Sequence, residues 1–258
     1  MIDSSLAVEF LNVVKKFDDQ VVCKDINLKI NKGQILSILG PSGCGKTVTI
    51  KMLIGLIIPD SGSICFDNID IAKISNEEDF SAIRRRISMV FQGAALFDSM
   101  SVFDNIAYPL KTFTSLSKEE IEHKVFHTLD LVGLPEAAYK SPPELSGGMK
   151  KRIGLARAII TEPEIILYDE PNAGLDPINT TRIIDLILML REKFSCTSIV
   201  ITHDMNVATS ISDNVAFMYA GRVRKTGTMD EFRHSEDPIV RGFVLGEPSV
   251  LLTTFGGF

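Results

Sequence analysis

Hydrophobic positions along the chain follow strand-like spacing in some segments and helix-like spacing in others, which predicts a mixed α/β fold. Val8–Val14 and Val21–Ile30 are rich in β-branched residues and partly alternate, as strands do. Gln34–Leu39 is a short apolar run bounded by glycines, which is typical of a strand buried on both faces. A glycine-rich loop and a predicted helix, Lys46–Leu56, follow it. Further strands are expected at Ile64–Phe66 and Ile87–Phe91.

The pattern becomes helical after Phe91 and stays so to about Ile160. Within this block a helix over Leu116–Val132 should begin at Ser117, because an acidic first turn follows that residue. Strand character then returns, so the helical block is predicted to be an insertion in the α/β core. The later expected elements are strands at Ile165–Tyr168 and Ser198–Thr202, a helix at Pro177–Lys193 between them, and two antiparallel strands within Ser212–Gly227.

Composition limits the function classes. The chain has 258 residues, 45% of them hydrophobic and 23% charged, as expected of a folded globular protein. Its net charge of −6 offers no general attraction to nucleic acid or to anionic lipid. The four cysteines lack the spacing of a zinc site, and no window is apolar enough to span a bilayer. Without a signal peptide in the N-terminal residues, we expect a cytoplasmic protein.

The glycine-rich loop matches the phosphate-binding pattern GxxxxGK[ST] at every required position. Glycines allow consecutive backbone N–H groups to curl around a phosphate, and the helix that follows directs its positive end toward it. Lys46 supplies a mobile charge for phosphate oxygens, and the Thr47 hydroxyl is a hard oxygen ligand for Mg²⁺. The expected nucleotide-binding residues here are Gly40, Pro41, Ser42, Gly43, Cys44, Gly45, Lys46, Thr47 and Val48.

Two adjacent carboxylates end the strand at Ile165–Tyr168. Asp169 is placed to reach Mg²⁺ through water, whereas Glu170 points to the other side of the strand and could polarise an attacking water. A strand that ends in Asp-Glu is common, so this pair alone does not distinguish a catalytic site from an ordinary strand end.

A second predicted anion site opens the helix that follows Leu145. Ser146, Gly147 and Gly148 lie about twenty residues before the acid pair, at a helix N-terminus. One chain does not need two such sites for one triphosphate, whereas two chains arranged head to tail do, because each covers the nucleotide of the other. We therefore expect a homodimer with ATP between its subunits.

With these motifs in this order, the sequence from about Ser5 to about Glu231 resembles the ABC ATPase family. The resemblance implies ATP hydrolysis with Mg²⁺ as cofactor. It assigns Phe17 to stacking on adenine, Gln92 to the Q-loop and His203 to the switch position. It also identifies Ser146–Gly148 as the signature and Ala173–Asp176 as the D-loop, with Asp176 near nucleotide. The implied catalytic residues are Glu170, His203 and Gln92, and the implied metal ligands are Thr47, Gln92 and Asp169.

The family also implies an architecture. We expect one ABC ATPase domain over residues 5–235, a P-loop NTPase core with an antiparallel β subdomain, and an inserted helical subdomain at about 93–160. Residues 236–258 are expected to form a C-terminal tail. Two positions depart from the family pattern: Val48 stands where many relatives have Ser or Thr, and Met149 replaces the usual Gln. ATP binding should survive the change at Val48 because a backbone N–H remains there. In the family, the Gln that Met149 replaces is less important than Ser146 and the two glycines.

Residues 90–110 are similar to the Mla/Mce-type lipid-transport ATPases. This resemblance implies a homodimer bound to an integral-membrane permease at the inner face of the cell membrane, and through the permease a lipid-binding envelope protein. The apolar stretch Ala94–Phe97 is expected to line, in part, a groove that receives a permease helix, with Leu96 as the residue to test.

Two alternative functions remain open. One is the ATPase of an importer for amino acids or other small solutes, which the shared motifs permit. The other is a non-transport ABC protein that acts on nucleic acid or ribosomes. Such proteins usually carry two cassettes or a long charged coiled coil. This chain has one cassette and a net negative charge, so we expect no nucleic-acid partner.

Overall fold

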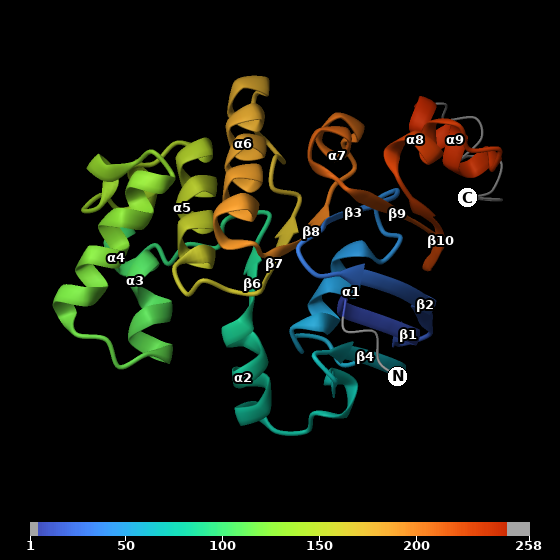
Figure 1. Ribbon diagram of the computed structural model, residues 1–258, viewed down its shortest axis with the longest axis horizontal. Coiled ribbons are helices and arrows are strands. Elements are labelled where there is room, and N and C mark those ends of the chain that lie inside the picture. Colours follow the sequence, from blue (N-terminus) through green and yellow to red (C-terminus); the bar gives the residue numbers. More distant parts are fainter. Residues whose placement is uncertain (1–4, 247–258) are drawn as a thin grey trace. The chain divides into compact units, whose positions relative to one another are not determined.

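The computed structural model describes Ser5–Gly246, and the chain divides into two compact units (Figure 1). Unit 1 contains the residues up to Asn76 together with those from Ile199 onward, and unit 2 contains Glu77–Ser198. Each unit combines helices with strands of a sheet, so the predicted mixed α/β class is confirmed. None of the helices between Ser5 and Gly246 is both long and apolar enough to cross a membrane.

An antiparallel sheet forms the first part of unit 1, in the strand order β2-β1-β4-β5. Its long hairpin confirms the first two predicted strands. A bulge in β1 explains why its buried positions are not strictly alternate: Phe10 pairs with Leu28 and Val13 with Ile26, so β1 has one residue more than β2 between these pairs. The strands are β1 (Leu6–Phe17), β2 (Gln20–Asn31), β4 (Ser61–Phe66) and β5 (Ile69–Asp70).

A mixed sheet has the strand order β10-β9-β3-β8-β7-β6, and the division between the units falls within β8. Strands β3 and β9 are parallel, as are β6 and β7, whereas β9 and β10 form the predicted antiparallel pair. Ala220 and Gly221 both have positive φ in the turn of that pair, as a tight hairpin requires. The strands are β3 (Ile35–Leu39), β6 (Ile87–Val90), β7 (Ile165–Asp169), β8 (Thr197–Ile201), β9 (Asn214–Tyr219) and β10 (Arg222–Gly227).

Four α-helices lie in the described part of unit 1. The first, α1, ends at Leu53 rather than at the predicted Leu56, because Gly55 turns the chain with a φ of 67°. Phe232 of α8 and Val240 of α9 pack in one core with residues of β9. The expected tail therefore begins with a packed helix, and its residues 247–258 lie outside the described part. The helices are α1 (Lys46–Leu53), α7 (Met205–Ile211), α8 (Met229–Arg233) and α9 (Pro238–Leu245).

Unit 2 contains the helical block predicted between residues 102 and 160. Helices α3, α4 and α5 contact one another (Figure 1). They share a core that includes Ile106, Leu129 and Ile153. Ser117 and Glu120 form a capping box on α4, as expected from the sequence. The helices are α2 (Glu77–Arg86), α3 (Val102–Phe113), α4 (Lys118–Leu131), α5 (Gly147–Ile159) and α6 (Pro177–Phe194). Three short 3₁₀ segments lie at Ile71–Lys73, Pro135–Ala137 and Pro142–Glu144.

Candidate nucleotide site

The predicted phosphate loop connects the buried strand β3 to helix α1 in unit 1. Two of its glycines have close neighbours where a side chain would begin. A β-carbon at Gly40 would overlap the carbonyl oxygen of Met218, and one at Gly45 would make a tight contact, 3.2 Å from the sulfur of Cys23. Both residues also have positive φ, 151° at Gly40 and 105° at Gly45. Steric overlap and positive φ therefore both favour glycine at Gly40, and positive φ is the main reason at Gly45.

Lys46 is buried at the start of α1, and its ammonium lies against the loop. Its Nζ donates to the carbonyl oxygens of Gly40, at 2.7 Å, and Pro41, at 3.0 Å. Thr47 and Val48 follow in the first turn of the helix and are half-buried. Among the described residues, none caps this N-terminus with its side chain. The arrangement gathers a cation and a helix N-terminus beside one glycine-rich loop, which suits a polyphosphate.

Two buried thiols lie close to the phosphate loop. Cys44 belongs to the loop, and Cys23 lies 3.8 Å from the hydroxyl of Thr49, measured from its sulfur. Burial raises the pKa of both thiols, and at Cys44 it outweighs the opposite effect of nearby Lys46. Both therefore remain neutral thiols that are buried as small apolar residues are.

The other two residues assigned from unit 1 lie at the surface. Phe17 is the last residue of β1 and is exposed, with the Nζ of Lys15 at 5.3 Å from its ring centre. His203 is exposed and lies two residues beyond β8, just before Asp204, which caps α7. Both side chains are accessible to a ligand, but their assignment to adenine and to the γ-phosphate stays a prediction.

In unit 2, the acid pair ends strand β7. Asp169 is its last residue and is buried, and Glu170 is half-buried with a φ of 49°. Positive φ is uncommon for a residue with a side chain, and here the chain reverses at once: the carbonyl oxygen of Glu170 accepts a hydrogen bond from the N–H of Ala173 at 3.1 Å. The sequence pattern predicted the pair, whereas this backbone conformation is a finding of the structure.

Lys151 connects the acid pair to the predicted Q-loop residue. Gln92 is exposed and lies two residues beyond β6. The Nζ of Lys151 donates to the main-chain oxygens of both Gln92 and Glu170, the latter at 3.2 Å. Burial lowers the pKa of Lys151, although the carboxylates of Glu170 and Asp169 act in the opposite direction.

The signature and the D-loop each begin a helix of unit 2. Ser146 is exposed and caps α5, with its hydroxyl oxygen accepting from the N–H of Met149 at 3.3 Å. Asp176 caps α6 and accepts from the N–H of Asn179 at 2.9 Å. This backbone bond lowers the pKa of Asp176, and the side chain of Asn179 adds to the effect. Both capping residues were assigned as nucleotide-binding from the sequence, and Asn179 was not.

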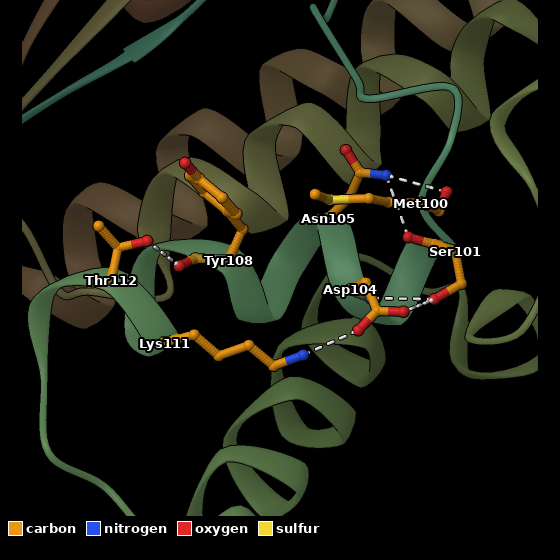
Figure 2. A network of polar contacts seen from close by, with 7 residues as sticks. All are labelled: Met100, Ser101, Asp104, Asn105, Tyr108, Lys111 and Thr112. Carbon is orange, nitrogen blue, oxygen red and sulfur yellow. Dashed lines mark hydrogen bonds and ion pairs between the residues drawn. The ribbon is translucent and has the colours of Figure 1, made fainter.

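The segment between Gln92 and α3 is held by Asn105, whose side chain is fully buried. Its amide nitrogen donates to the carbonyl oxygens of Met100 and Ser101 (Figure 2). The same nitrogen donates to the carbonyl oxygen of Phe97, and the amide oxygen accepts from the N–H of Phe97 at 2.8 Å. Four hydrogen bonds to main-chain atoms therefore fix the conformation of residues 97–101. This role of Asn105 was not predicted from the sequence.

The predicted metal ligands are all oxygen donors, and their assignment stays a prediction. Between Ser5 and Gly246, no three His, Cys, Asp or Glu residues gather where they could hold a metal ion. The assigned ligands are a hydroxyl at Thr47, an amide at Gln92 and one carboxylate at Asp169. Mg²⁺ prefers oxygen ligands and usually keeps waters and substrate phosphates, so few protein ligands are expected.

Comparisons with known proteins identify the family. Residues 23–173 match the ABC transporter family. The intermembrane phospholipid transport system ATP-binding protein MlaF of Haemophilus influenzae is 41% identical over 240 residues, which are 93% of this chain and 90% of that protein. The probable ribonucleotide transport ATP-binding protein mkl of Mycobacterium leprae is 39% identical over 241 residues, 93% of this chain and 69% of that protein.

A solved structure agrees with this assignment. The ATP-binding cassette MJ0796, in a dimeric post-hydrolysis state bound to ADP and Pi, has a TM-score of 0.79 and 31% identity, covering 86% of this chain and 98% of that one. The chain therefore belongs to the ABC transporter family. It is an ATP-binding, ATP-hydrolysing subunit of a transporter, the kind of subunit that works with a membrane permease.

Proposed function

We propose that this chain drives lipid transport by hydrolysing ATP as a homodimer bound to a membrane permease. The observation that carries the cargo assignment is the 41% identity to MlaF, which extends over nearly the whole of both chains. The likeness of residues 90–110 to lipid-transport ATPases supports the same cargo. The subunit would lie at the inner face of the membrane, and through its permease it would serve a lipid-binding envelope protein.

In the proposed chemistry, the phosphate loop binds the triphosphate and Glu170 orients and polarises the attacking water. Lys46 would neutralise charge on the phosphate oxygens, and His203 would contact the γ-phosphate. Mg²⁺, held by Thr47, Gln92 and Asp169, would supply further neutralisation of phosphate charge. Phe17 would stack on adenine, where an exposed aromatic ring is available.

The proposed assembly follows from the second helix N-terminus. Ser146 and the glycines after it would complete the site formed by the phosphate loop of the other subunit, with Asp176 beside it. The exposure of Ser146 at the start of α5 supports this role, because an interface residue must be accessible in the single chain. The dimeric cassette MJ0796 supports the same arrangement by analogy.

Import of a small solute is the second candidate. It is retained because the mkl protein, at 39% identity, is named for ribonucleotide transport, and the methionine import ATP-binding protein MetN of Carboxydothermus hydrogenoformans is 41% identical over 221 residues. Identity alone therefore does not separate the two cargo classes. The phospholipid assignment is preferred because MlaF is matched over 90% of its length and mkl over 69%.

Purification with the native permease would test this function. Lipids extracted from the complex would be identified by mass spectrometry, and the complex would be reconstituted in vesicles that contain a fluorescent phospholipid. We expect ATP-dependent movement of the phospholipid with the wild-type chain and none with Glu170→Gln. Absence of lipid movement, together with turnover that rises on addition of a small solute, would favour the importer.

A further inference from the structure

Lys151 lies where three motifs of unit 2 meet. It belongs to the second turn of α5, the helix that Ser146 caps. Strands β6 and β7 are parallel neighbours, with Val90 paired to Tyr168, so their carboxyl ends lie side by side. The ammonium of Lys151 bridges the two segments that continue beyond these ends, through main-chain oxygens of Gln92 and Glu170.

The bond from Lys151 acts on a backbone that is not in a relaxed conformation. Glu170 has a φ of 49°, and its carbonyl oxygen accepts from both Ala173 N–H and Lys151 Nζ. Fixing this carbonyl fixes the peptide plane after Glu170, and with it the direction in which the Glu170 side chain leaves the chain. An ammonium group suits this position because it donates several hydrogen bonds and accepts none.

Helix α5 holds the segment after Gln92 by further contacts. The guanidinium of Arg157 donates to the carbonyl oxygens of Ala94 and Ala95, both at 2.8 Å, and both alanines have positive φ. Gly154 faces Ala94 so closely that a β-carbon added there would lie 3.2 Å from that of Ala94. These contacts reach only the segment after β6, whereas Lys151 also reaches the segment after β7.

We propose that Lys151 is a positioning residue for ATP hydrolysis, which holds the backbones of Gln92 and Glu170 in a fixed relation to each other. Its side chain is 7% exposed, so it acts from beneath the two segments rather than on the nucleotide. The inference rests on the proposed roles of Gln92 and Glu170. The inference adds to these roles a residue on the signature helix, Lys151, that holds the backbones of both Gln92 and Glu170.

The test measures steady-state ATP hydrolysis and ATP affinity of the full chain for Lys151→Met, Lys151→Arg and the neighbour Lys150→Met. We expect Lys151→Met to lower kcat at least about tenfold while KM and the Kd for ATP stay within about twofold, because Lys151 orients catalytic groups rather than binding nucleotide. Lys151→Arg should keep most of the wild-type kcat that Lys151→Met loses, because a guanidinium can also donate to two carbonyls. Lys150→Met should leave kcat, KM and the Kd for ATP unchanged.

Circular dichroism and thermal unfolding would establish that each variant folds. If Lys151→Met does not fold, Lys151→Gln takes its place, because the shorter neutral amide cannot reach both carbonyls. Normal kcat in the folded Met or Gln variant, or loss of the fold in the Met, Gln and Arg variants alike, would overturn the positioning role. Glu170→Gln is assayed in parallel, so that failure of the proposed catalytic site can be told from failure of the Lys151 inference. Fast turnover in Glu170→Gln contradicts the proposed catalytic site. Slow turnover in Glu170→Gln together with normal turnover in Lys151→Met contradicts only the positioning role of Lys151.

Discussion

Gly148 lies so close to Asn179 that a β-carbon added at the glycine would be 2.9 Å from the side-chain oxygen of the asparagine. Asn179 cannot easily move away, because its N–H and its amide nitrogen both donate to the carboxylate of Asp176. The second residue of the signature helix is therefore packed against the first turn of α6. This contact links the predicted signature and the predicted D-loop within unit 2.

Replacement of Gly148 by Ala should therefore lower the melting temperature. The new methyl group must displace Asn179 from Asp176, at a cost of about 1–3 kcal/mol. Gly147→Ala is the matched control, because a β-carbon at Gly147 meets no atom within 4 Å and Ala favours the helix. Adding Asn179→Ala to Gly148→Ala should recover part of the loss, since it removes the obstructing amide. Equal melting of the two glycine variants would contradict this account.

Asn105→Ala should destabilise unit 2 by about 3 kcal/mol, because four hydrogen bonds to the main chain of residues 97–101 are lost and a buried cavity is left. Urea-induced unfolding measures the change. Thr112→Val serves as the control: its hydroxyl bonds the carbonyl of Tyr108 on an exposed part of the same helix, and its loss should cost under about 0.5 kcal/mol. Similar midpoints for the two variants would show that the Asn105 network does not fix the segment.

Glu170→Gln should cut ATP turnover about a hundredfold or more while ATP binding is retained. The amide preserves the shape of the side chain but cannot accept a proton from the attacking water. An ATP-bound dimer should then accumulate, which size-exclusion chromatography in ATP and Mg²⁺ would detect. Near-normal turnover would remove Glu170 from the catalytic site.

Elements whose signals are local could be predicted from the sequence. The glycine-rich loop before α1, the cap at Ser117 and the antiparallel pair within Ser212–Gly227 each depend on residue types within a few positions, and the structure has all three. Helix α2 was missed because only Phe80 and Ile83 are buried in it, too few positions to establish a helical period.

The finer features of the site depend on contacts between segments far apart in the chain. Lys151 is one of three consecutive basic residues, and its sequence context does not reveal that it bonds Gln92 and Glu170, which lie 59 and 19 residues away. The same is true of Asn179, whose role depends on how closely Gly148 approaches it. Positive φ at Glu170 follows from such contacts and not from the propensity of glutamate.

Mixed dimers test whether catalysis is shared between subunits. A Lys46→Ala chain lacks its phosphate-loop cation, and a Ser146→Arg chain has an obstructed signature. A heterodimer of the two has one intact composite site and one doubly damaged site. We expect the mixture to regain part of the ATPase activity that each parent lacks, measured on heterodimers isolated with two different affinity tags. If isolated heterodimers remain as inactive as the parents, Lys46 and Ser146 do not act in one site across the interface.

The expected permease groove must be tested at a different residue from Leu96. That side chain is half-buried and packs against the helical core, so a charge there would disturb folding. Phe97 is 42% exposed, and its ring centre lies 5.1 Å from that of Tyr108, which is 41% exposed. Arg157 lies over the Phe97 ring at 5.6 Å, so the pair forms an exposed aromatic surface joined to the helix that holds the segment after Gln92.

Phe97→Asp should therefore leave basal ATP hydrolysis within about twofold of wild type while it weakens co-purification with the permease and abolishes lipid transport. The reason is that a helix docked on this surface would lose its contact with the Phe97 ring and would have to desolvate a carboxylate, which costs free energy even beside Arg157. Tyr139→Asp is the matched control. Tyr139 is an aromatic residue of the same unit and is 80% exposed, but its ring contacts Phe126, which is not part of the Phe97–Tyr108 pair. Both variants would be assayed for fold, for ATPase activity alone and for pull-down with the permease. If Phe97→Asp folds and still drives transport as Tyr139→Asp does, the permease contacts another surface, and the aromatic pair only stabilises the helical subdomain.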